Sequence, residues 1–193
     1  MDKITADDIL LSLNPELNRQ QVFKAKESAG KSGSFFFFSF DRRFLIKTMN
    51  NAELKVFRNC LPDYVMFLRE NPDSMIARIY GVFTVQMEDI TPVHLLLMSN
   101  AAQAGKNIKN VFDLKGSIIN RKVEDHHITA GGTLKDVNLL DLKRKEIFLR
   151  FQRRDKVRIM RQIHLDINFM QKFMIMDYSL LLIVEENPDW KSE

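Results

Sequence analysis

The segment GKSGSFFFFSF at residues 30–40 restricts the fold more than any other part of the chain. Four consecutive phenylalanines favour a β-strand, because aromatic side chains suit the pleated, half-buried surface of a sheet. A polar stretch at residues 41–43 and a second apolar run, FLIKT at residues 44–48, follow at once. This order predicts a β-hairpin, and we expect most of the four phenylalanines to lie in the core.

The composition is typical of a globular protein with room for one ordinary domain or two small lobes. The chain has 193 residues, of which 45% are hydrophobic and 28% charged, and its net charge of +4 permits an acidic partner. The single Cys60 excludes an intrachain disulfide and suits a reducing compartment. No apolar run approaches the roughly 20 residues of a transmembrane helix, and the first residues do not resemble a signal peptide. We therefore expect an intracellular protein with at most peripheral membrane contact.

The first half of the chain is predicted to be rich in strands, with one helical insertion. Residues 3–13 favour a short helix, and Pro15 is expected to close that region. Residues 50–59 favour a helix that Pro62 interrupts, because proline lacks the N–H of a helical bond, with a further helix running to residue 69. Strand-like segments follow at residues 75–86 and 93–98, the second apolar enough for a buried central strand.

The second half is predicted to mix helices and strands. Polar and small residues at 99–110 form the expected boundary between two lobes. Beyond it we expect a strand pair at residues 111–114 and 118–122, followed by a loop-rich stretch at 125–138. A long helix with isoleucines at three- and four-residue steps is expected at 144–174, and a last strand at 180–184. The predicted fold class is α+β.

The letters GKS at residues 30–32 invite comparison with the P-loop of nucleotide-binding proteins. That loop needs a glycine five residues before Gly30, where Ala25 stands, and it leads into a helix, whereas phenylalanines follow here. A kinase-like order of strand, glycine loop, strand, turn and lysine-bearing strand fits better. In it, Lys47 would neutralise nucleotide phosphates, and Glu53 would hold Lys47 when no nucleotide is bound. The residues alone leave open an ordinary hairpin with a solvated lysine.

Asp177 is the only charged residue in MIMDYSLLLIV, residues 174–184. A buried carboxylate without a partner is unfavourable, so we expect this side chain to have a partner or a task. One task is to accept the proton of an acceptor hydroxyl during phosphoryl transfer. The alternative is that Asp177 caps a turn.

The stretch VFDLKGS, residues 111–117, carries a third set of polar groups. Asp113 and Lys115 are two residues apart and so lie on one side of an extended chain. Gly116 and Ser117 suit a tight turn rich in hydrogen-bond donors. Such an arrangement would bind a phosphate, or it would be a surface ion pair at a hairpin.

Together these stretches resemble the phosphatidylinositol phosphate kinase family, in particular its phosphatidylinositol 4-phosphate 5-kinases. The resemblance covers nearly the whole chain and rests on GKSGSFFFFS, RFLIKT, AELKVFRNCLPDY, NPDSMIARIYGVFTVQ, FDLKGS, TLKD and, most specifically, IMDYSLLL. It implies a two-lobed kinase-like fold with antiparallel sheets in both lobes. The N-terminal lobe would occupy residues 1–98, and an incomplete C-terminal lobe residues 99–193.

The resemblance also implies roles for individual residues. Asp177 would be the catalytic aspartate and would act with Lys47, the lysine that contacts ATP. Asp113, Lys115 and Arg121 would lie near the phosphoinositide headgroup. Three features would bind the nucleotide: a phosphate-covering loop, the lysine with its glutamate, and a hinge within residues 97–100 that holds the adenine. Their residues are Gly30, Lys31, Ser32, Gly33 and Ser34 in the loop, Lys47 with Glu53, and Met98 with Asn100 in the hinge.

The implied reaction transfers the γ-phosphate of ATP, with Mg²⁺, to a phosphatidylinositol monophosphate, expected to be the 4-phosphate that becomes the 4,5-bisphosphate. No metal-binding residue is identified, because the family's second metal-binding aspartate and its activation loop would follow residue 193. We therefore expect the chain to bind ATP and to turn it over poorly or not at all. The alternative is a catalytically inactive phosphoinositide-binding or regulatory module of the same fold. Ile118 and Ile183 stand where the family usually has threonine and glycine.

Basic residues are concentrated at residues 141–161. A basic residue near an anionic leaflet contributes about 1 kcal/mol to binding, so we expect a phosphoinositide lipid as partner, at the cytosolic face of the plasma membrane. No aromatic interleaving supports nucleic-acid binding, although a basic scaffold for protein or RNA stays open, as does a homodimer. The segment has three acidic residues, Asp141, Glu146 and Asp155. It has nine basic residues: Lys143, Arg144, Lys145, Arg150, Arg153, Arg154, Lys156, Arg158 and Arg161.

Overall fold

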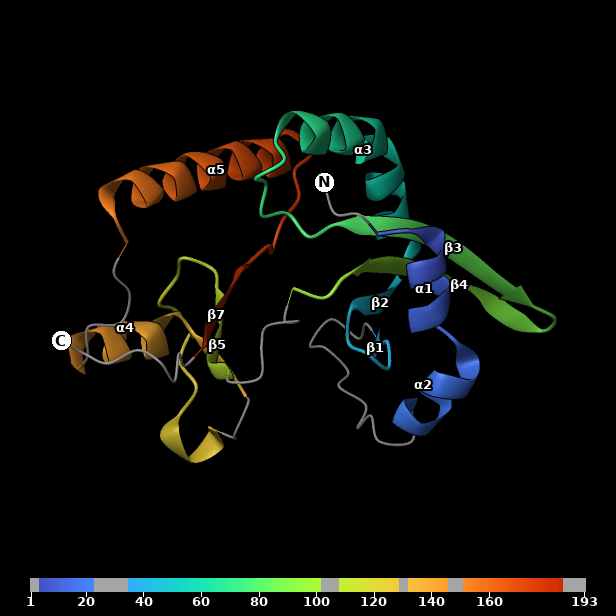
Figure 1. The fold of residues 1–193 in the computed structure, drawn as a ribbon, viewed down its shortest axis with the longest axis horizontal. Helices are drawn as coiled ribbons and strands as arrows, with labels where there is room; N and C mark the ends of the chain where they lie inside the picture. The colour runs from blue at the N-terminus through green and yellow to red at the C-terminus, as the bar shows by residue number, and fades with distance from the viewer. Residues whose placement is uncertain (1–3, 23–34, 102–107, 129–131, 146–150, 186–193) are drawn as a thin grey trace. The chain divides into compact units, whose positions relative to one another are not determined.

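The computed structural model describes residues 4–22, 35–101, 108–128, 132–145 and 151–185, with the side chains of 20–22 and 143–145 left out. The chain divides into two compact units, Met1–Gln103 and Ala104–Glu193 (Figure 1). This division falls within the polar segment 99–110, a few residues beyond the boundary predicted from the sequence.

Two short helices begin the first unit, α1 (Ala6–Ser12) and α2 (Pro15–Val22). Pro15 was expected to end this region, but it is the first residue of α2. Proline suits that position because the first helical N–H needs no partner within the helix. The Asn14 side chain accepts the next amide, from Glu16, at 2.9 Å.

Within the described residues, the sheet of the first unit has four strands: β1 (Phe36–Phe38), β2 (Phe44–Met49), β3 (Ile79–Met87) and β4 (Ile90–Ser99). They are ordered β1-β2-β4-β3, and every neighbouring pair is antiparallel (Figure 1). The predicted hairpin of β1 and β2 is confirmed, and β4 has the central place expected of it. β1 with β2 and β3 with β4 are neighbours along the chain, whereas both α3 and β3 lie between β2 and its other partner, β4, in the sequence.

The phenylalanine run is less buried than expected. Phe35 and Phe38 are 49% and 44% exposed, whereas Phe44, which follows the turn, is fully buried. Phe36 and Phe37 are only half-buried, so the expectation that most of the four lie in the core was wrong. The reason is topological: among the described strands, β1 lies at the edge of the sheet and has a neighbour on one side only. The ring of Phe44 packs edge-on against Tyr80 at a centroid distance of 5.3 Å.

Helix α3 (Asn51–Glu70) is continuous through Pro62, so the predicted interruption was wrong. A proline inside a helix costs about 3 kcal/mol, which tertiary packing outweighs here. Tyr64 is buried, and its hydroxyl accepts the N–H of Ile79 at 2.8 Å and donates to the carbonyl of Ala77 at 3.0 Å. These bonds join α3, two residues after the proline, to the start of β3.

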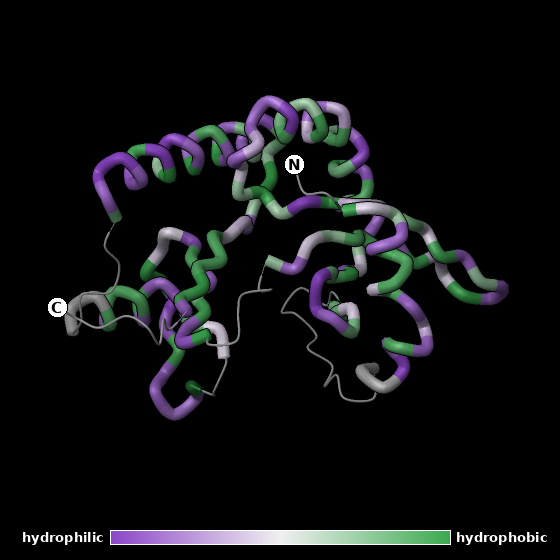
Figure 2. The backbone as a smooth tube through the Cα atoms, in the orientation of Figure 1, coloured by the Kyte–Doolittle hydropathy of each residue, from purple (hydrophilic) through white to green (hydrophobic). Residues whose placement is uncertain are grey.

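The described part of the second unit forms a sheet of three strands, β5 (Ile108–Leu114), β6 (Thr133–Lys135) and β7 (Leu180–Glu185), ordered β6-β5-β7. The β5–β7 pair is antiparallel as expected, whereas the β5–β6 pair is parallel, so this sheet is mixed. Hydrophobic residues predominate along β7 (Figure 2). Phe112 in the central strand is fully buried, next to the buried Leu134 of β6.

The strand predicted at residues 118–122 is wrong, because these residues, all described, form a turn. Ile118 and Ile119 are mostly exposed, and Asn120 has a positive φ of 57°. The central strand, β5, pairs instead with two strands farther along the chain. β6 lies on one side of it and β7 on the other, and leucines of both pair with β5 residues.

Three helical segments complete the described part of the second unit: the short 3-10 helix η1 (Asp125–His127), α4 (Asp136–Lys145) and α5 (Arg153–Lys172). The stretch 125–138 is thus more ordered than predicted, and the long helix begins later than residue 144 would imply. Helix α4 lies against β5 and β6. Among the described helices, none combines the length and the apolar character needed to cross a membrane.

Candidate active site

Lys47 and Glu53 form an ion pair in the first unit. Lys47 lies in β2 opposite Leu96 of β4, and Glu53 lies in the first turn of α3. The Lys47 Nζ atom is 3.6 Å from Glu53 Oε1, and both side chains are partly exposed. The ion pair expected from the sequence is therefore present, and it leaves the ammonium group within reach of a ligand.

The start of α3 fixes the direction of Glu53. The Asn50 side chain accepts the N–H of Glu53 at 2.9 Å, and Glu53 Oε2 accepts the N–H of Asn50 at 2.9 Å. This reciprocal capping box satisfies two backbone donors at once. It uses one carboxylate oxygen and leaves the other for Lys47.

The two hinge residues of the nucleotide prediction lie at the end of β4. Met98 pairs with Leu45 of β2, and Asn100 follows the strand. Asn100 is buried, and its side-chain amide donates to the carbonyl of Arg42 at 2.8 Å. Its backbone N–H donates to the carbonyl of Arg43 at 3.0 Å. The Asn100 side chain thus ties the end of β4 to the turn between β1 and β2.

The predicted phosphate-covering loop lies outside the described residues. Its members are Gly30, Lys31, Ser32, Gly33 and Ser34. Their role stays a prediction from the sequence.

In the second unit, strand pairing brings Lys115 and Asp177 together. Leu114, the last residue of β5, pairs with Leu180, the first residue of β7. Because the strands are antiparallel, the residue after β5 and the residues before β7 meet at one edge of the sheet. Lys115 Nζ lies 3.7 Å from Asp177 Oδ1.

The environment of Asp177 differs from the sequence-based expectation. Its apolar neighbours in sequence suggested burial, but its side chain is 91% exposed. The physical reason is that the carboxylate lies in the connection between α5 and β7, before the strand begins to bury side chains. Asp177 has a positive φ of 58°, a conformation that is uncommon for residues other than glycine and is concentrated at functional sites. The expected partner is present, and it is Lys115.

Arg121 is held by two carboxylates. Its Nε donates to Asp136 Oδ2 at 2.8 Å, and its Nη2 donates to Asp113 Oδ2 at 3.1 Å and to the Asp113 carbonyl. The Arg121 side chain is only 13% exposed. The hydrogen bond to Asp136 raises the pKa of Arg121 above its ordinary value. The predicted contact of Arg121 with a headgroup stays a prediction, and in this structure the guanidinium binds protein groups.

Asp136 was not among the predicted site residues. Its Oδ1 accepts the backbone N–H groups of Lys115 and Gly116 at 3.0 and 2.8 Å. Burial by itself raises the pKa of Asp136, but the hydrogen bonds from Arg121 and the backbone outweigh it and hold the pKa below its ordinary value. The sequence offered only a carboxylate in TLKD, directly before a helical segment. That local pattern does not predict that the Asp136 carboxylate accepts hydrogen bonds from Lys115, Gly116 and Arg121.

Within the described ranges, no three His, Cys, Asp or Glu side chains gather closely enough to hold a metal ion. The residues that the structure brings together are therefore two ion-paired clusters, one in each unit. Each offers a partly exposed lysine beside a carboxylate.

Comparison with known proteins shows the family. A family profile described as Phosphatidylinositol-4-phosphate 5-Kinase matches residues 17–193. The chain belongs to this family. Because the match covers residues 17–193, both ion-paired clusters lie within the matched region.

Several curated relatives of the phosphatidylinositol-4-phosphate 5-kinase family are similar over most of the chain. A phosphatidylinositol 4-phosphate 5-kinase of Schizosaccharomyces pombe is 33% identical over 185 residues, which are 95% of this chain and 24% of the relative. A probable phosphatidylinositol phosphate kinase of Dictyostelium discoideum is 35% identical and covers 92% of this chain and 24% of its own length. A type-1 beta phosphatidylinositol 4-phosphate 5-kinase of Gallus gallus is 31% identical over 79% of this chain and 28% of its own. The chain thus spans about a quarter of the length of these relatives.

Proposed function

We propose that this chain carries part of the phosphoryl-transfer machinery of a lipid kinase. The reaction would move the γ-phosphate of ATP to a phosphatidylinositol monophosphate, with the 4-phosphate becoming the 4,5-bisphosphate. The observation that carries the proposal is the 3.7 Å approach of Lys115 Nζ to the exposed carboxylate of Asp177. The names of the relatives support the lipid substrate.

Asp177 is the proposed general base. Its carboxylate is exposed, so an acceptor hydroxyl has access to it, and a base must come within hydrogen-bond reach of the proton that it takes. Asp177 would orient the inositol hydroxyl and accept its proton as the phosphoryl group is transferred. Lys115, beside it, would hold the carboxylate in place and present positive charge to the anionic substrate.

Lys47 is the proposed nucleotide lysine. Bound ATP would supply the phosphoryl group, and the partly exposed Lys47 ammonium fits its α- and β-phosphates. Glu53 would hold Lys47 in the direction of those phosphates. Met98 and Asn100, with the loop at residues 30–34, are proposed as the remaining nucleotide contacts. Mg²⁺ is proposed as the companion of ATP, without an assignment to particular residues.

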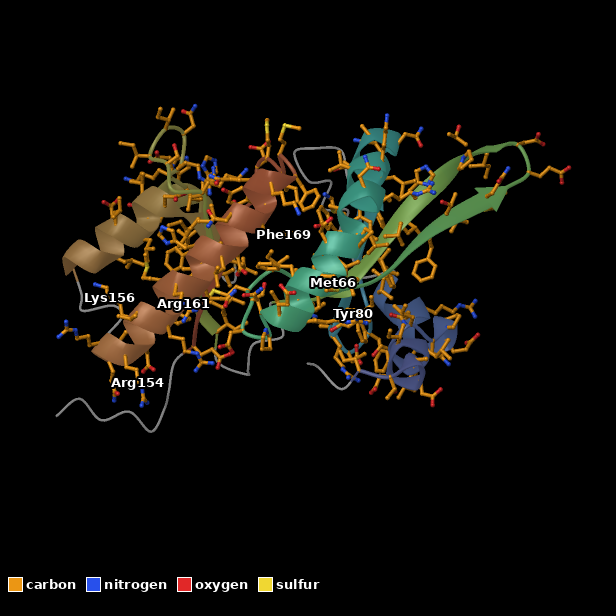
Figure 3. The ribbon with its side chains drawn as sticks, turned by 90° about the horizontal axis from the view of Figure 1, so that it is seen from above. Met66, Tyr80, Arg154, Lys156, Arg161 and Phe169 are labelled. Carbon is orange, nitrogen blue, oxygen red and sulfur yellow. The ribbon has the colours of Figure 1, made fainter. Side chains whose placement is uncertain are left out.

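The membrane partner is proposed to be an anionic, phosphoinositide-containing surface at the cytosolic face of the plasma membrane. Helix α5 supports this proposal, because its N-terminal half exposes the basic residues Arg153, Arg154, Lys156 and Arg161. Figure 3 shows Arg154 and Lys156 at that end of the helix, with Arg161 farther along and Phe169 near the other end. A surface of this charge attracts anionic headgroups.

The deciding experiment measures transfer from labelled ATP to vesicles of phosphatidylinositol 4-phosphate by the full-length protein. We expect transfer that is lost in Asp177→Asn and kept in Asp89→Asn, a control at the turn between β3 and β4. Vesicles of phosphatidylinositol 5-phosphate test which ring hydroxyl is used. Activity that survives Asp177→Asn would overturn the assignment of the base.

The alternative is a catalytically inactive phosphoinositide-binding or regulatory module. It predicts vesicle binding without transfer, and clear transfer by residues 1–193 alone would remove it. Competition of vesicle binding by a soluble inositol polyphosphate but not by RNA would argue against a scaffold for nucleic acid.

A further inference from the structure

Asp136 lies beneath the turn that carries Lys115. It is the first residue of α4 and one of the buried polar residues of the chain. Its two carboxylate oxygens have separate partners: Oδ1 accepts the amides of Lys115 and Gly116, and Oδ2 accepts Nε of Arg121. A carboxylate so placed holds the backbone of the turn and one side chain at the same time.

These bonds fix where the Lys115 side chain begins. Consecutive amides that point at one oxygen restrict the backbone at both residues, and Gly116 takes the required positive φ of 69°. The turn therefore leaves β5 in one direction. From there Lys115 reaches Asp177 across the edge of the β5–β7 pair.

Arg121 completes the arrangement from the other side. It neutralises the buried carboxylate of Asp136, which would otherwise be unfavourable, and it also binds the side chain and carbonyl of Asp113. Asp113 is in β5, so Arg121 joins the strand to the first residue of α4. The turn is thereby tied to both of the elements that flank it in space.

We propose that Asp136 and Arg121 are positioning residues that place Lys115 beside Asp177. In this structure the guanidinium of Arg121 is directed at the carboxylates of Asp113 and Asp136, and it acts on Lys115 through this clamp. The catalytic consequence rests on the proposed kinase function, whereas the clamp itself does not.

The first test measures hydrogen exchange at the amides of Lys115 and Gly116 in the 193-residue chain. Asp136→Ala removes both acceptors, and we expect exchange at these amides to become at least about tenfold faster. Asp136→Asn keeps an oxygen at the same place and should give a smaller change. The matched control is Asp141→Asn, on the same helix as Asp136. It removes the ion pair between Asp141 and Lys122 and should leave both amides unchanged.

Protection along β5 and β7 shows whether each variant still folds. If Asp136→Ala loses that protection, the comparison is made with Asp136→Asn and with Arg121→Gln, which keeps a polar side chain. Unchanged exchange at both amides in folded variants would overturn the clamp.

The second test is a double-mutant cycle in the full-length protein. Asp136→Ala should lower kcat by about tenfold or more with KM for ATP nearly unchanged, because Lys115 is displaced while Lys47 is not. In a Lys115→Ala background the same substitution should cost less than about twofold, since the residue it positions is gone. Equal losses in both backgrounds would show a role in stability alone and would overturn the proposal. If the unmodified protein transfers no phosphate, the proposed function fails, and the exchange result still decides the clamp.

Discussion

At Glu53, the two carboxylate oxygens have separate partners. Oε2 accepts the backbone N–H of Asn50 at 2.9 Å, and Oε1 lies 3.6 Å from Lys47 Nζ. The start of α3 and the direction of Lys47 are therefore coupled through one side chain. Asp136 divides its oxygens in the same way, between two backbone amides and Arg121. In both clusters, a residue that orders the backbone also orders the charge beside it.

Gly116 is the residue at which backbone conformation matters most in the second cluster. Its φ of 69° is a left-handed conformation that costs an L-residue about 1 kcal/mol. Among the described atoms, none lies within 4 Å of an added Cβ, so the expected penalty is conformational and not a clash. Gly116→Ala should lower the free energy of unfolding by about 1 kcal/mol, and Gly116→Asn by less, because asparagine tolerates this region. Urea denaturation measures both, and equal losses for the two variants would contradict this reasoning.

Asp41 predicts how the first unit responds to acid. Burial by itself raises the pKa of Asp41, but hydrogen bonds from Ser12, Ser39 and the N–H of Arg43 outweigh it and hold the pKa below its ordinary value. Because the folded-state pKa is lower than that of the unfolded chain, the stabilisation is present above the unfolded-state pKa and is lost as the pH falls through the folded-state pKa.

The matching variant is Asp41→Asn, which cannot titrate. It should be less stable than the unmodified chain at neutral pH and should lose less stability on acidification, as measured by urea denaturation over a pH series. Asp89→Asn, at the β3–β4 turn, is the control. An identical acid response of Asp41→Asn and the unmodified chain would refute the assignment.

At the scale of elements, His94 joins β4 to β3 and to the first residue of α3. Its Nδ1 lies 2.9 Å from the Thr84 hydroxyl, and its Nε2 lies 2.7 Å from Asn51 Oδ1. An amide oxygen only accepts, so Nε2 carries the proton and donates to Asn51. This contact holds the helix start two residues before Glu53. It thereby supports the position from which Glu53 reaches Lys47.

Removing this contact should loosen the first turn of α3. In His94→Ala we expect amide exchange in that turn to become about fivefold faster, the effect of losing one net hydrogen bond. His164→Ala, in the exposed part of α5, is the matched control and should leave the turn unchanged. Exchange that is equally fast in both variants would show that His94 does not fasten the helix.

The elements also show which local patterns are reliable. The hairpin, the central strand and the last strand follow from alternation and from apolar runs, and they lie within a few residues of their predicted places. Both prolines were misread as helix stops. Pro15 occupies a position where no N–H is needed, and the turn around Pro62 is held by packing of Tyr64 that no local pattern reports.

At the scale of the whole molecule, charge is unevenly distributed. Exposed basic residues gather in the N-terminal half of α5, and hydrophilic residues alternate with hydrophobic ones along the helix (Figure 2). The basic residues Lys143, Arg144, Lys145 and Arg150 of the predicted basic segment have no described side chains. The basic residues of this segment whose side chains are described therefore all lie in the N-terminal half of α5.

Neutralising α5 tests the membrane proposal directly. Glutamine at positions 153, 154, 156 and 161 together should weaken binding to vesicles that contain phosphatidylinositol 4-phosphate by at least about tenfold, since each charge contributes roughly 1 kcal/mol. The matched control replaces Lys55, Arg58 and Arg69, exposed on α3, with glutamine and should change binding less. A vesicle sedimentation assay measures both. Equal binding by the α5 variant and the unmodified protein would contradict the proposal.

The sequence by itself determined the fold class, the order of most elements and the family, because these depend on patterns read over short windows of chain. It also identified Lys47 with Glu53, which are six residues apart and separated by a single helix cap. Only the tertiary structure decided that β5 pairs with β6 and β7 and that Asp177 is exposed beside Lys115. It also decided that Asp136 holds the turn at Lys115 and Gly116. Those contacts join residues 20 to 77 positions apart, from Gly116 with Asp136 to Ile108 with Glu185. They arise from strand pairing and from the pairing of a buried carboxylate, which depend on the burial of the whole unit and leave no periodic signal along the chain.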